Sequence, residues 1–158
     1  MHDLSHIRRF LRVAQSLSKR HHADGQILTY AAYFHGIDQE KHKGDLVRFL
    51  ESQGLHGRKA KRVLRVALES HKESHPRTIE GKVLHDAHLV EGGRAFMVAK
   101  SLVTGVSRGS SLRQIADYFE ESIDGKYKCY LPETREAYVE EERFARDFFH
   151  SLKKSLQS

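Results

Sequence analysis

The chain has 158 residues, 39% of them apolar and 30% charged, with a formal net charge of +6. It is most simply one domain, spanning 1–158, that builds a core beneath a charged surface. No apolar run approaches the roughly 18 residues of a membrane span, and the start at Met1 lacks the regions of a signal peptide, so we expect a cytoplasmic protein. The lone cysteine, Cys129, excludes an internal disulfide and fits a reducing compartment.

The positive charge indicates anionic partners such as nucleotides or nucleic acid. The basic residues are scattered along the chain, without the interleaved aromatic residues that are typical of a single-strand binding surface. The charge does not choose between these partners, but this composition argues against nucleic acid, and no membrane partner is expected. Most of these charges are interpreted as solvated helix faces.

Apolar residues recur with a helical period in the first half of the chain. The first predicted helix runs from about Asp3 to Arg20, the second from Asp24 and Gly25 through Tyr33, and the third from Asp45 to a stop at Gly54. A fourth helix follows Gly57, and a short fifth helix after Pro76 leads to His85 and Asp86. Two residues after Tyr33, the histidine His35 ends an apolar stretch.

The second half of the chain also has helical patterning. After Gly92 and Gly93 we expect a helix that ends at Gly105, and Ser111 with Gln114 forms a capping box for the next one. A long final helix starts at Pro132, and its predicted inner face is formed by Ala137, Glu141, Phe144, Phe148 and Leu152. Only 126–131 could form a strand. The fold class is therefore all-α, a single-domain helical bundle.

Three side chains from separate segments could converge on one metal ion. His6 lies beside the apolar stripe of the first helix, His35 ends the apolar second helix, and Asp86 follows in the fifth. Helical bundles build metal sites in this way, with each helix providing an inward ligand. Imidazole and carboxylate together suit Mn, Fe, Co, Ni, Mg or Zn. From spacing alone, the alternative is that these are ordinary core residues, because the chain has 12 histidines.

Several motifs resemble those of small bacterial HD-domain proteins, which are metal-dependent phosphohydrolases. The segment 2–10 is similar to the H-D-x-x-H-x-x-R-V opening of that family, and 31–37 resembles its A-A-L-L-H-D-I segment. The segment 80–89 is similar to E-G-K-I-V-Q-D-A-D-R-L. The likeness is colinear from His2 to about Leu152. It implies an HD-type helical bundle with a divalent ion held by His6, His35 and Asp86, where Asp86 is also a catalytic residue.

Two positions depart from the family pattern. Gly36 stands where the HD aspartate is expected, and His88 replaces the second acidic residue of the Asp-Ala-Asp triplet. Asp38 lies on the face of His35 if the helix continues past Gly36, and it could then replace the missing ligand; otherwise it is an exposed loop residue. His71 stands where relatives have a pocket histidine, and His71 or His88 could also enter the metal shell.

The resemblance predicts hydrolysis of a nucleotide or a similar phosphate ester. Catalysis would involve Asp86, Asp38 and His71, and Arg9, His71, His88 and Arg108 would bind the substrate. The alternative is a degenerate HD-like domain that binds a nucleotide or a protein partner without turnover, with the metal weakly held or absent. A homodimer is a further expectation, since Tyr118, Phe119, Phe148 and Phe149 could be either core residues or dimer contacts.

Overall fold

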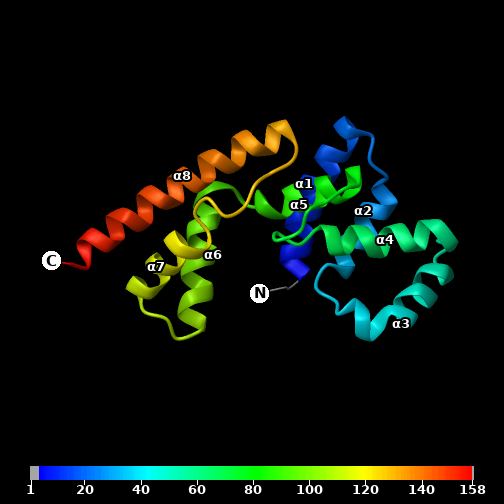
Figure 1. Ribbon diagram of the computed structural model, residues 1–158, viewed down its shortest axis with the longest axis horizontal. Helices are drawn as coiled ribbons and strands as arrows, with labels where there is room; N and C mark the ends of the chain where they lie inside the picture. Colours follow the sequence, from blue (N-terminus) through cyan, green and yellow to red (C-terminus); the bar gives the residue numbers. More distant parts are fainter. Residues whose placement is uncertain (1–3, 158) are drawn as a thin grey trace. The chain divides into compact units, whose positions relative to one another are not determined.

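A computed structural model describes residues 4–157, and the regular structure in this range is entirely helical (Figure 1). The helices are α1 (Leu4–His21), α2 (Gly25–Phe34), α3 (Gln39–Ser52), α4 (Gly57–Glu69), α5 (Ile79–Leu89), α6 (Gly93–Ser107), α7 (Leu112–Ser122) and α8 (Pro132–Ser155). The predicted all-α class is confirmed. Within the described range, no helix is both long enough and apolar enough to cross a bilayer.

The chain forms two compact units, and each is described by itself. The N-terminal unit contains α1 to α5 and ends at Leu89, and the C-terminal unit starts at Val90 and contains α6 to α8. The organisation of 1–158 as a single domain stays a prediction.

Side-chain caps fix where several helices begin. The Asp24 carboxylate accepts hydrogen bonds from the backbone N–H groups of Gln26 and Ile27 at 2.9 and 3.2 Å, which opens α2. The predicted capping box at α7 is confirmed, because Ser111 and Gln114 bond each other's backbone N–H groups. These caps satisfy amide groups that have no partner within the helix.

One predicted helix start was wrong, and the one segment that could have formed a strand does not. The third helix begins at Gln39 rather than at Asp45, because Asp38 caps it and the polar stretch after Asp38 is helical without an apolar period. It does end as predicted, since Gly54 takes a positive φ of 78° and the Leu55 N–H donates to the Leu50 carbonyl. Residues 126–131 form no strand. The predicted start of the first helix, at Asp3, lies outside the described residues.

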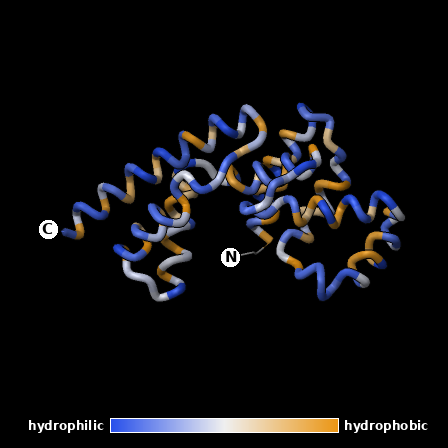
Figure 2. The backbone as a smooth tube through the Cα atoms, viewed as in Figure 1, coloured by the Kyte–Doolittle hydropathy of each residue, from blue (hydrophilic) through white to orange (hydrophobic). Residues whose placement is uncertain are grey.

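In the N-terminal unit, α1 packs against α5 and α2, and α4 packs against α2 and α5. Apolar residues recur at helical spacing along these segments, as Figure 2 shows by colour. The core includes the fully buried side chains of Phe10, Leu28, Leu50, Val63 and Leu84. This core carries the buried histidines described below.

In the C-terminal unit, α6, α7 and α8 pack against one another. The core combines Val98, Ile115, Ala116, Phe119, Ala145 and Phe149. The predicted inner face of α8 is confirmed at Glu141, which is buried, and at Leu152, which packs against the core. It was wrong at Phe144 and Phe148, which are 43% and 37% exposed, whereas Phe149 is fully buried. Tyr118 is likewise exposed, so of the four aromatic residues considered above, Phe119 and Phe149 belong to the core.

Glu141 on α8 makes the stability of the C-terminal unit depend on pH. Its side chain is buried, and this burial raises the pKa of Glu141 from 4.5 to about 7, although Arg94 opposes the shift. The folded protein therefore binds a proton that the unfolded chain releases above pH 4.5. This contribution to stability is complete below that pH, falls as pH rises towards about 7, and is lost above it.

We expect Glu141→Gln to remove this dependence. Between about pH 5 and about pH 8, the wild-type protein should lose roughly 1–3 kcal/mol of unfolding free energy that the variant retains. Denaturant titrations of both proteins at the two pH values measure the difference. Glu140→Gln, at the exposed neighbouring position, is the matched control and should behave as the wild type.

Candidate metal centre

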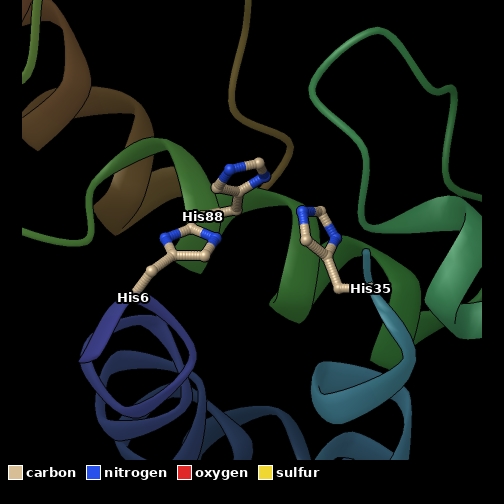
Figure 3. A group of neighbouring side chains, drawn as sticks. All are labelled: His6, His35 and His88. Carbon is tan, nitrogen blue, oxygen red and sulfur yellow. The ribbon is translucent and has the colours of Figure 1, made fainter. Parts of the chain in front are cut away.

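Three histidines from three helical segments converge inside the N-terminal unit. His6 lies on α1, His35 directly follows α2, and His88 lies near the end of α5 (Figure 3). Each offers a ring nitrogen, and these three atoms lie within 4.8 Å of one another. His6 and His35 are each only 1% exposed, and His88 is partly buried. Three imidazoles gathered in this way form a donor set that fits a divalent transition-metal ion.

Ser70, the residue that follows α4, orients two of these rings. The Ser70 hydroxyl donates its proton to the Ala67 carbonyl at 2.6 Å, so its oxygen accepts from Nδ1–H of His35 at 2.7 Å. The Ser70 carbonyl oxygen can only accept, and Nδ1 of His88 lies 3.2 Å from it. In their neutral forms, both rings therefore carry the lone pair on Nε2. Metal-bound histidines are commonly held by such a second hydrogen bond.

Phe10 packs against all three imidazoles. It lies one turn after His6 on α1 and is fully buried. Its ring centroid is 5.2 Å from that of His6, 5.5 Å from that of His35 and 5.8 Å from that of His88. An apolar ring in this place restricts the rotamers of the histidines and keeps water from that side of the cluster.

The structure brings His6 and His35 together, but the third member of the group is His88 and not Asp86. Asp86 is fully buried on α5, and its Oδ1 lies 3.0 Å from Nδ1 of His85. The other ring nitrogen of His85 lies 3.3 Å from the Lys72 carbonyl oxygen. The His85–Asp86 pair therefore ties α5 to the segment after α4. Direct metal ligation by Asp86 stays a prediction from the resemblance.

A cleft of about 800 Å³ opens beside His35. The ring of His71 lines it and stacks on the His35 ring, with centroids 4.6 Å apart and planes 24° apart. The cleft is lined by residues of α3, α4 and the α2–α3 turn, among them Gly36, Asp38, Lys43, Lys61 and Arg65. His35 thus belongs both to the histidine cluster and to the cleft wall.

The premise for Asp38 as a replacement ligand was wrong. The helix does not continue past Gly36, because α2 ends at Phe34 and a turn follows. The Asp38 carboxylate accepts from the N–H groups of Glu40 and Lys41 at 3.1 and 3.2 Å, so it caps α3 at the edge of the cleft.

The two predicted phosphate-binding arginines lie in different units. Arg9 is on α1, and its guanidinium donates to Ser5 Oγ at 2.8 Å. Arg108 directly follows α6 in the C-terminal unit and is exposed. Their contact with a substrate stays a prediction.

Sequence reasoning missed Ser70 and the position of Phe10 beneath the rings. A serine at a helix end is usually a local cap, and a phenylalanine in an apolar stripe is usually a core residue. The spacing of Phe10, four residues after His6, was the one available signal, because it places both side chains on the same face of α1.

The sequence matches no protein-family model and no curated protein, whereas several solved structures resemble this one. The Lin1889 protein of Listeria innocua is 20% identical with a TM-score of 0.80, and the match covers 99% of this chain and 88% of that one. Bacillus subtilis YpgQ in complex with ADP is 23% identical with a TM-score of 0.78, covering 98% and 86%. An HD-superfamily hydrolase of Bacillus thuringiensis is 21% identical with a TM-score of 0.77, covering 99% and 87%. These similarities show that the chain has an HD-like helical fold.

Proposed function

We propose that this protein is a metal-dependent phosphohydrolase that acts on a nucleotide or a similar phosphate ester. The observation that carries the proposal is the double role of His35, which joins a three-histidine cluster to a cleft of about 800 Å³. The HD-superfamily hydrolase from Bacillus thuringiensis and the ADP complex of YpgQ are among the proteins with a similar fold, which supports this class of reaction and of ligand.

His6, His35 and His88 are the proposed metal ligands. A divalent ion held there would supply positive charge to phosphoryl oxygens and lower the pKa of a water molecule that it binds. Ser70 and Phe10 fix the ring orientations in advance, so little rearrangement is needed when an ion binds.

Residues that line the cleft have the other proposed roles, which are charge neutralisation and proton transfer. Lys43 and Lys61 are exposed cations on the cleft wall that can neutralise a phosphate, while Arg65 also lines the cleft but is paired with Glu69 at 2.9 Å. His71 is the proposed proton carrier, because its imidazole is partly exposed and stacks directly on His35. Gly36 also lines the cleft and adds no side chain to it. A cytoplasmic location and a homodimer belong to the same proposal.

The test is phosphate release before and after metal removal. Purified protein is treated with a chelator, reconstituted with single divalent ions, and given nucleoside mono-, di- and triphosphates in turn. We expect release of phosphate or pyrophosphate only from the reconstituted protein. If the protein binds both metal and nucleotide without turnover, the hydrolase proposal fails, and the alternative of a binding module is favoured, as Gly36 in place of an acidic residue would permit.

Replacing Ser70 by alanine should weaken metal binding. The variant loses the hydroxyl that holds His35, but it keeps the carbonyl that holds His88. Loss of such an outer partner typically lowers metal affinity roughly 10–100-fold. Competition with a metal-binding dye measures the change. Ser52→Ala is the matched control, because Ser52 makes the same bond to a carbonyl three residues earlier, at the exposed end of α3.

A further inference from the structure

The histidine cluster contains nitrogen donors only. Among the described residues, the group whose ligand atoms converge consists of His6, His35 and His88, without a carboxylate. The two positions at which the resembled family has acidic residues are occupied by Gly36 and His88. The donor set is therefore neutral and made of imidazoles.

Four carboxylates of the N-terminal unit make other contacts. Each of them bonds a backbone N–H group or a side chain of its surroundings: Asp38 caps α3, Asp86 bonds His85, Glu69 bonds Thr78 and Arg65, and Glu80 bonds Arg62. Asp86 and its partner His85 are both buried, so breaking their bond to move Asp86 into the metal shell would leave a buried polar group without that partner, at a cost of about 1–3 kcal/mol.

We propose that this centre selects ions that prefer nitrogen ligands, Zn²⁺ and Co²⁺, over Mn²⁺ and Mg²⁺; the inference rests on the metal site of the proposed function. Mg²⁺ and Mn²⁺ favour oxygen ligands, whereas imidazole suits Zn²⁺ and Co²⁺. Three histidines with an open fourth position are an established arrangement for catalytic zinc. The replacement of two acidic positions thus changes the ion that the fold accepts.

Ser70 strengthens this selectivity. By engaging Nδ1 of both His35 and His88, it leaves the Nε2 lone pair of each neutral ring for a metal ion. A preorganised, compact nitrogen set suits a four-coordinate ion, whereas Mg²⁺ requires near-octahedral oxygen coordination and gives up its water reluctantly.

The experiment measures binding of single metals to the full-length protein without substrate. Metal-free protein is equilibrated with Zn²⁺, Co²⁺, Mn²⁺ or Mg²⁺, and bound metal is counted by mass spectrometry. We expect one Zn²⁺ per chain and an affinity at least about a hundredfold tighter than for Mn²⁺, as the ligand preferences imply. The visible absorption of bound Co²⁺ should have the intensity of a four-coordinate site. Equal or tighter binding of Mn²⁺ or Mg²⁺ would overturn the inference.

Two variants test whether the nitrogen donors cause the preference for Zn²⁺. His88→Asp introduces an oxygen ligand and should reduce the preference for Zn²⁺ over Mn²⁺ by about tenfold or more. His56→Ala, at an exposed position before α4, is the control for adventitious binding by surface histidines and should leave the preference unchanged. An unaltered preference in folded His88→Asp protein would contradict the assignment. Tight Zn²⁺ binding without phosphate release would instead contradict only the hydrolase proposal.

Discussion

Replacing His35 by alanine is expected to abolish metal binding and, with it, phosphate release. His35 provides one of three nitrogen donors, and its ring also contacts Ser70, Phe10 and His71. Losing a direct ligand should cost more than losing an outer-shell partner, so we expect at least about a hundredfold weaker metal binding. Bound metal per chain and the rate of phosphate release are measured on the same preparation.

A second variant separates loss of the metal site from loss of the fold. His88→Ala removes a proposed ligand that is only partly buried, so it should disturb packing less while weakening metal binding to a similar extent. Circular dichroism and thermal melts of the metal-free proteins check that both variants are folded. His56→Ala should match the wild type in every measurement. Wild-type metal content in both folded ligand variants would exclude this cluster as the metal centre.

Replacing Phe149 by alanine is expected to destabilise the C-terminal unit by about 3–5 kcal/mol. The Phe149 side chain is fully buried, and its ring lies 4.7 Å from that of Phe119, centroid to centroid, within the core of this unit. Alanine would leave a cavity among α6, α7 and α8 that helices packed at native density fill only partly.

Phe148 is the matched control for this substitution. It is the preceding residue of α8 and is 37% exposed, so Phe148→Ala should cost about 1 kcal/mol or less. Denaturant unfolding, followed by hydrogen exchange of α7 and α8, measures both variants. If Phe148→Ala proved the more destabilising, the inner face of α8 would be the one expected from the sequence and not the one in the structure.

The comparison at α8 shows what apolar periodicity can predict. The pattern located this helix and its start at Pro132, because proline at the first turn and recurring apolar residues are local signals. It identified the inward positions of Glu141 and Leu152 but not which phenylalanine is buried. Adjacent phenylalanines at 148 and 149 lie about 100° apart around the helix, so either could point inwards until α6 and α7 are in place.

The start of α3 is a helix boundary that apolar periodicity could not predict. Residues 39–44 have no apolar period, and the helix starts there because it is capped by the carboxylate of Asp38, the residue that the sequence offers as a possible metal ligand. An aspartate can either cap a helix or bind a metal ion, and the local sequence does not distinguish these two roles. The turn after Phe34 decided the question by directing Asp38 towards the amides of α3.

The sequence by itself determined the helical class, most helix boundaries, and the candidacy of His6 and His35 as partners in one site. Caps, glycine stops and helical periodicity act over a few residues, so they can be read locally. Only the tertiary structure decided that His88, rather than Asp86, completes the cluster, and that Ser70 orients two of its rings. Both depend on how α1, α2, α4 and α5 pack, since a difference of two residues on α5 turns a side chain by about 200°.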